Sequence, residues 1–183
     1  VQLMLTLLYT VFVFSGAAGL IYESIWVRYL GLFVGHSAYA QVIVLVIFMG
    51  GMSIGALLAG ERSARLRSPL LWYAGIELAA GVIGLVFHDA FIALTTLGYD
   101  RVFPALGAGN TQLIVKWAMA ALLILPQSIL LGATFPLMSA GVIRIAPDRG
   151  GRSLAMLYFS NSFGAAVGVL VSGFYLVAMA GLP

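Results

Sequence analysis

Residues 39–60, YAQVIVLVIFMGGMSIGALLAG, run without a single charged side chain. A bilayer hydrocarbon core about 30 Å thick is crossed by a helix of about 20 apolar residues. This stretch has that length and composition, and it ends at the hydrophilic sequence ERSARLR of residues 61–67. It therefore predicts a transmembrane helix followed by a loop in water.

The composition of the whole chain points the same way. Hydrophobic residues make up 62% of the 183 residues and charged residues 8%, whereas soluble domains carry about 25% charged residues. The net charge of +3 comes from nine dispersed basic residues, which is too few for a nucleic-acid-binding surface. We therefore expect the lipid bilayer, and not nucleic acid, to be the main partner.

The alternation of long apolar runs and short polar breaks predicts a single all-α membrane domain over residues 1–183. We expect a bundle of about five transmembrane helices, with an amphipathic tail at 24–33 and an interfacial helix plus loop at 88–109. Pro126 and Pro136 are expected to kink the fourth span. Because the chain begins with Val1, we expect it to be a piece of a longer protein. The expected spans are residues 3–24, 39–60, 69–87, 112–144 and 153–180.

Arginines cluster in two short predicted loops, and a five-span bundle places both loops on one side of the membrane. Short cytoplasmic loops are enriched in Lys and Arg. The arginine-rich side is therefore expected to be cytoplasmic, together with the N-terminus. These residues are Arg62, Arg65 and Arg67 in the first loop and Arg144, Arg149 and Arg152 in the second.

Small residues recur at four-residue spacing in two of the predicted spans. Such pairs let helix backbones approach closely in lipid, where the hydrophobic effect does not drive helices together. We expect them to lie at helix–helix contacts. The pairs are Gly51 with Gly55, Ala56 with Gly60, and Gly164 with Gly168.

Glu77 is the most informative ionisable residue, because it lies eight residues inside the third predicted span. A charged side chain at the centre of a membrane costs about 2.5 to 3.5 kcal/mol on insertion scales, so it needs a partner or a function. Two readings are open. Glu77 binds a cation or proton in a cavity, or it is a hydrogen-bonded carboxyl that joins two helices.

Three further polar residues fall within predicted spans. Glu23 either pairs with Arg28, five residues on, or lines a cavity. Gln127 and Asn161 either line a polar path or make interhelical hydrogen bonds, which are worth about 0.6 to 2 kcal/mol. With Glu77, these residues form the candidate substrate-binding set.

The sequence offers no support for catalysis, metal binding or a cofactor. Cysteine is absent, and His36 and His88 have no His or Glu three or four residues away. There is no GxSxG sequence, no phosphate-binding loop and no dinucleotide-binding glycine pattern.

Five segments together resemble the membrane region of bacterial spermidine synthase-like membrane proteins. In that family a helical bundle, similar to part of a major facilitator transporter, is fused to a soluble aminopropyltransferase-type domain. The resemblance implies a bacterial inner-membrane location, and it places any enzymatic activity in a soluble domain whose motifs are missing here. The segments are FSGAAGLIYESIWVRYLGLFVG (14–35), FMGGMSIGALLAGERSARLR (48–67), YAGIELAAGVIGL (73–85), LPQSILLGATFPLM (125–138) and LYFSNSFGAAVGVLVSGFYLVAMAGL (157–182).

The resemblance leads to two expectations about function. The first is a transporter-like domain for a small cationic or amphiphilic metabolite such as a polyamine, since buried acids suit cations. The second is a membrane anchor or accessory subunit for a soluble aminopropyltransferase-type domain or a partner membrane complex. A transporter needs polar groups that converge on a cavity near the midplane. The position of Glu77, Gln127 and Asn161 relative to one cavity therefore distinguishes the two.

Overall fold

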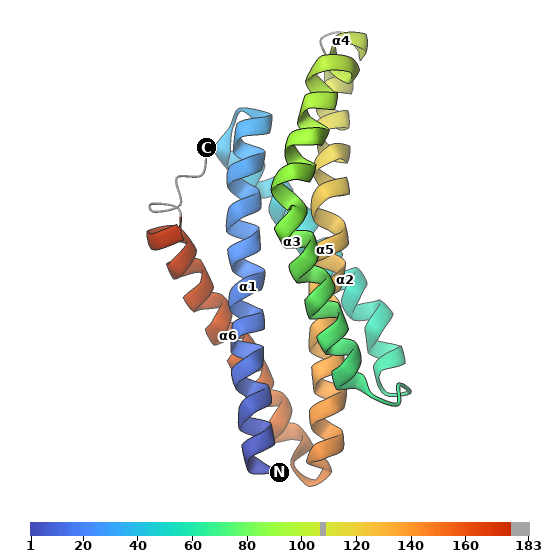
Figure 1. Ribbon diagram of the computed structural model, residues 1–183, viewed down its shortest axis with the longest axis vertical. Coiled ribbons are helices and arrows are strands. Elements are labelled where there is room, and N and C mark those ends of the chain that lie inside the picture. The colour runs from blue at the N-terminus through green and yellow to red at the C-terminus, as the bar shows by residue number, and fades with distance from the viewer. Residues whose placement is uncertain (107–108, 177–183) are drawn as a thin grey trace.

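The structure, a computed structural model, describes residues 1–106 and 109–176. Within these ranges the chain is helical and has no β-strand, and five helical segments are long and apolar enough to cross a membrane (Figure 1). This confirms the expected all-α fold and the expected number of long apolar helices. The long helices are α1 (Gln2–Val34), α2 (Ser37–Ser63), α3 (Pro69–Leu97), α5 (Asn110–Ile145) and α6 (Gly150–Val171).

Short helical pieces connect or extend the long helices. A π-helical turn, η1 (Gly98–Val102), and α4 (Phe103–Leu106) continue α3. A 3₁₀ turn, η2 (Pro147–Arg149), joins α5 to α6, and a second π-helical turn, η3 (Ser172–Leu176), extends α6. Helix α5 packs along α2 and α3, while α1 packs mainly against α6 and also against α2 (Figure 1).

Helix α1 is a single helix of 33 residues, so the expected division near Ser24 into a span and an amphipathic tail is wrong. Residues 24–33 pack into the bundle, as the full burial of Trp26 and Leu30 shows. The helix ends at Val34 and is capped by Gly35, which has a left-handed φ of 80° and donates its backbone N–H to the Gly31 carbonyl at 2.9 Å. Glycine adopts this φ without steric cost, which makes it a common helix terminator.

Helix α3 also runs further than the sequence suggested. It was expected to end near Phe87, but the helical segment continues from Pro69 to Leu106 without the separate interfacial helix. The extension is held by aromatic packing, since the Tyr29 ring of α1 lies 5.5 Å from Phe87 and 4.8 Å from Phe91 between centroids. Tertiary contacts of this kind override weak local signals.

The remaining span limits agree more closely with expectation. Helix α5 stays continuous through both internal prolines and ends within two residues of the expected limits. The last predicted span, 153–180, begins three residues earlier in the structure, and its residues 177–180 lie outside the described part of the chain.

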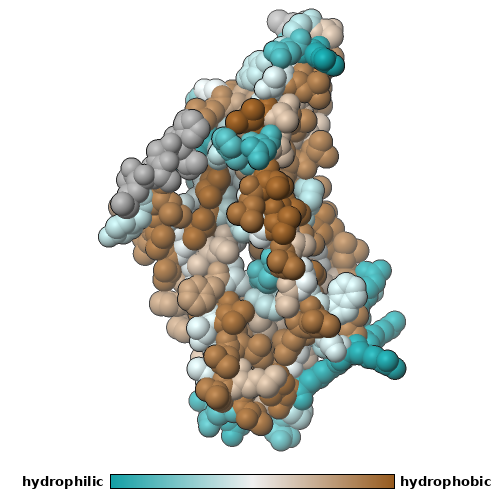
Figure 2. Space-filling model, in the orientation of Figure 1, coloured by the Kyte–Doolittle hydropathy of each residue, from teal (hydrophilic) through white to brown (hydrophobic). Residues whose placement is uncertain are grey.

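Two apolar core clusters lie at different heights in the bundle. One is built around Trp26, Phe48 and Ile124, and the other around Phe12 and Leu157. Large hydrophobic side chains cover much of the outer surface, as Figure 2 shows for one face. A surface of this kind suits lipid and not water.

Glycines let two helix pairs cross in backbone contact. A Cβ atom added at Gly164 would overlap the backbone of Val13, and one added at Gly55 would overlap the backbone of Ile129. A Cβ atom at Gly168 would likewise overlap the backbone of Ala17, and one at Gly51 would overlap the Cβ of Ser128, which confirms that these small-residue pairs lie at the α2–α5 and α1–α6 crossings. Gly60 has open space around it, so its expected contact is wrong.

We predict that Gly55→Ala and Gly164→Ala each destabilise the protein by about 1 to 3 kcal/mol, because the added methyl group forces the backbones apart. The matched control is Gly81→Ala, where a Cβ meets nothing within 4 Å and alanine favours the helix. Thermal unfolding in detergent measures the effect. Equal melting temperatures for all three variants would contradict the close-contact interpretation.

The two arginine-rich loops lie at the same end of the bundle. The Arg144 guanidinium at the end of α5 donates hydrogen bonds to the carbonyls of Arg67 (3.0 Å) and Ala64 (2.7 Å) in the loop between α2 and α3. The N-terminus lies at this end too (Figure 1). The structure thus confirms that the loops share one end, and the side of the membrane that this end faces stays a prediction.

We predict that cysteines introduced at Ser68 and Asp148 are both shielded from an impermeant thiol reagent in intact cells, because the arginine-rich end faces the cytoplasm. Both positions are exposed in the structure, and the native chain has no cysteine to interfere. A cysteine at Ser37, exposed at the opposite end, should be labelled. Labelling of Ser68→Cys or Asp148→Cys in intact cells would contradict the predicted orientation.

Candidate functional site

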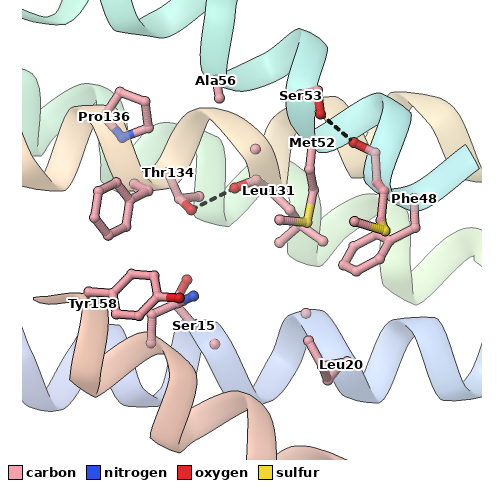
Figure 3. Close-up of a pocket in the computed structure, with 16 residues that line it drawn as sticks. Ser15, Leu20, Phe48, Met52, Ser53, Ala56, Leu131, Thr134, Pro136 and Tyr158 are labelled. Carbon is pink, nitrogen blue, oxygen red and sulfur yellow. Dashed lines mark hydrogen bonds between the residues drawn. The ribbon is translucent and has the colours of Figure 1, made fainter. Parts of the chain in front are cut away.

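A cavity of about 440 Å³ lies between four helices, α1, α2, α5 and α6. On α1 its lining residues, 15–20, come after the buried Phe12 of one core cluster and before Trp26 of the other. The cavity therefore separates the two clusters. The labelled side chains that line it in Figure 3 are Ser15, Leu20, Phe48, Met52, Ser53, Ala56, Leu131, Thr134, Pro136 and Tyr158.

The cavity lies between the two glycine crossings. Gly16 is pressed against Asn161 where α1 meets α6, and Gly132 against the backbone of Met52 where α2 meets α5. All four residues line the cavity. Each helix pair is held tightly within itself, and the space between the pairs is left open.

The lining is mostly apolar, with five uncharged polar side chains and no charged one. Two of the hydroxyls are used within their own helices: Ser53 donates to the Met49 carbonyl at 2.8 Å and Thr134 to the Leu131 carbonyl at 2.6 Å. The α6 side chains Tyr158 and Asn161 supply further polar groups at the cavity wall.

Glu77 does not line this cavity, but it is one hydrogen bond away from it. The Ser15 hydroxyl of α1 donates to Oε1 of Glu77 on α3, and Ser15 is part of the cavity wall. Glu77 itself is half-buried. Figure 2 shows a small hydrophilic area at mid-height on the face formed by α1 and α3, within hydrophobic surroundings.

Tyr73 completes a polar cluster with this pair. Its ring packs edge-on against Phe12 at 6.2 Å between centroids. Its buried hydroxyl lies beside Ser15 and Glu77 but makes no hydrogen bond with the described residues. Neither Ser15 nor Tyr73 was predicted from the sequence. Ser15 is 62 residues from Glu77, so no local pattern links them. Tyr73 lies four residues before Glu77 on α3, and this one-turn spacing was the local signal that could have identified it.

Gln127 is fully buried at the contact of α5 and α3 and lies outside the cavity. Its Nε2 donates to the Ala80 carbonyl at 2.9 Å, while its Oε1 has no partner among the described residues. Of the two readings left open for Gln127, the structure shows the interhelical hydrogen bond.

Glu23 is half-buried and is also not part of the cavity wall. Five residues separate it from Arg28, which puts the two side chains about 140° apart around the helix, an unfavourable arrangement for an ion pair. Of the four candidate residues, Asn161 alone lines the cavity. Across the described ranges, no three His, Asp or Glu side chains gather to form a metal site.

Comparison of the chain with protein-family models, with curated proteins and with solved structures gives no match. The resemblance to spermidine synthase-like membrane proteins therefore stays a hypothesis, carried by the sequence segments alone.

We predict that Ser15 and Glu77 are energetically coupled. Ser15→Ala and Glu77→Ala should each lower stability, and the double variant should lose about 0.6 to 2 kcal/mol less than the sum, because the shared hydrogen bond is lost only once. A double-mutant cycle of thermal unfolding in detergent measures this coupling, with Ser53→Ala and Glu77→Ala as the control pair. Strict additivity for Ser15 and Glu77 would show that the hydrogen bond contributes nothing.

Proposed function

We propose that the chain is a transporter-like membrane domain that binds a small cationic or amphiphilic metabolite, with polyamines as the expected class. The observation that carries the proposal is the cavity near the middle of the bundle. Ser15 on its wall lies about 20 Å along the axis from the start of α1 and about 28 Å from its end, and sites near the midplane are typical of transporters.

The chemistry of the cavity suits a molecule with apolar and amine parts. The apolar lining from α2 and α5 accommodates methylene segments, and the amide oxygen of Asn161 and the hydroxyl of Tyr158 are acceptors for amine N–H groups. The negative charge that a cation needs would come from Glu77, which lies directly behind Ser15. Rotation of the Ser15 hydroxyl away from Glu77 would expose the carboxylate to the amine.

On the family resemblance, we propose that the chain belongs to a bacterial inner-membrane protein. By the positive-inside rule, we propose that its N-terminus is cytoplasmic. A soluble aminopropyltransferase-type domain elsewhere in the full-length protein, or a partner membrane complex, would be its partner. This assignment rests on the arginine-rich end and on the family resemblance together.

We predict that Gly19→Leu abolishes uptake or efflux of labelled spermidine by full-length protein reconstituted in liposomes. Gly19 lines the cavity and a Cβ there meets nothing within 4 Å, so leucine fills the cavity without pushing helices apart. The matched control is Gly75→Leu, which has equally open surroundings outside the cavity and should keep transport. Glu77→Gln should also abolish transport, since glutamine cannot carry the negative charge.

If the wild-type protein transports spermidine and both the Gly19→Leu and the Glu77→Gln variants transport it equally well, the cavity is not the substrate site. Retained folding of each variant is checked by its melting temperature in detergent.

A second candidate function is a membrane anchor or accessory subunit. It is favoured by the observation that Glu77 and Gln127 make interhelical hydrogen bonds instead of converging on the cavity. An anchor needs a stable bundle and no substrate space. It therefore predicts no spermidine flux in wild-type liposomes, together with unchanged membrane localisation and cellular function in the Gly19→Leu variant.

A further inference from the structure

A groove of about 490 Å³ lies between the first half of α1 and the first half of α6, apart from the central cavity. It begins at the arginine-rich end, where Gln2, Arg149 and Arg152 line it. It closes deeper in the bundle where Gly164 meets the backbone of Val13. Because α1 and α6 cross at an angle, they diverge from this contact toward the end of the bundle (Figure 1).

The mouth of the groove is positively charged. Arg149 and Arg152 are exposed there, whereas Arg144 is bonded to loop carbonyls. Asp148, the neighbour of Arg149, is not among the residues that line the groove. Two guanidinium groups with five N–H donors each form a strong site for phosphate oxygens.

The deeper wall of the groove is apolar and aromatic. Phe159 and Phe163, one helical turn apart on α6, stack with centroids 5.9 Å apart and planes at 15°. Both rings are more than half exposed, at 59% and 52%. From Arg152 to Phe163 the helix rises about 16 Å, close to half of a hydrocarbon core of about 30 Å.

We infer that this groove binds an anionic phospholipid, with the phosphate on Arg149 and Arg152 and one acyl chain along Phe159 and Phe163. Basic pockets between transmembrane helices are a recognised setting for acidic lipid headgroups. The charge at the mouth selects an anionic headgroup, and the depth of the apolar wall matches an acyl chain in one leaflet. The inference is independent of any substrate in the central cavity.

The test uses purified full-length protein in a neutral detergent, titrated with phosphatidylglycerol or with phosphatidylcholine of the same acyl chains. Native mass spectrometry counts bound lipid, and thermal unfolding reports stabilisation. Phosphatidylglycerol should bind and raise the melting temperature, and phosphatidylcholine should do so much less. The double variant Arg149→Gln/Arg152→Gln should bind phosphatidylglycerol about thirtyfold more weakly, since each arginine near the surface contributes about 1 kcal/mol.

The control is Arg62→Gln/Arg65→Gln, which removes the same charge from the same end but outside the groove, and should bind as wild type does. Phe163→Ala should weaken binding of the lipid without changing headgroup selectivity. The proposed site would be overturned if both arginine double variants lost the same affinity for phosphatidylglycerol, or if phosphatidylglycerol and phosphatidylcholine bound equally well. It would also be overturned if glycerol 3-phosphate alone raised the melting temperature as much as phosphatidylglycerol does. Efficient disulfide cross-linking of Phe159→Cys between two copies in liposomes would also overturn it, because a second copy would then fill the groove.

Discussion

The structure depends on backbone contact between helices at two crossings. In a bilayer, lipid chains are as apolar as the helix surfaces, so packing must come from close van der Waals contact and interhelical hydrogen bonds. Gly164 of α6 meets the backbone of Val13, and Gly55 of α2 meets that of Ile129. Larger residues would keep these helices further apart, so each glycine sets the distance between its two helices.

The central cavity is a consequence of these crossings. The α1–α6 pair and the α2–α5 pair are each packed tightly, and the side chains that fill the space above and below them leave a space at mid-height. The polar residues of the spans surround this space unevenly. Asn161 lies on its wall, Glu77 lies behind Ser15, and Gln127 lies in the separate α3–α5 contact.

The two ends of the bundle differ in their electrostatics. One end carries the arginine-rich loops, where Arg144 ties the loop between α2 and α3 to the end of α5. At the opposite end Lys116 lies 5.4 Å from the ring centroid of Phe33 and donates to its backbone carbonyl at 3.3 Å. That lysine satisfies a carbonyl at the end of α1 and lies among aromatic rings. One basic residue at each end therefore holds neighbouring helices together, Arg144 at the arginine-rich end and Lys116 at the other.

Composition and periodicity by themselves determined the class of fold, the number of apolar spans and the common end of the arginine loops. These properties follow from hydropathy along the chain, which is a local quantity. Tertiary packing decided where α1 and α3 end, because buried Trp26 and the Tyr29 contacts with Phe87 and Phe91 stabilise helix beyond the expected limits. It also decided which polar residues meet. Ser15 and Glu77 are 62 residues apart, and only the packing of α1 against α3 brings the hydroxyl within hydrogen-bonding distance of the carboxylate.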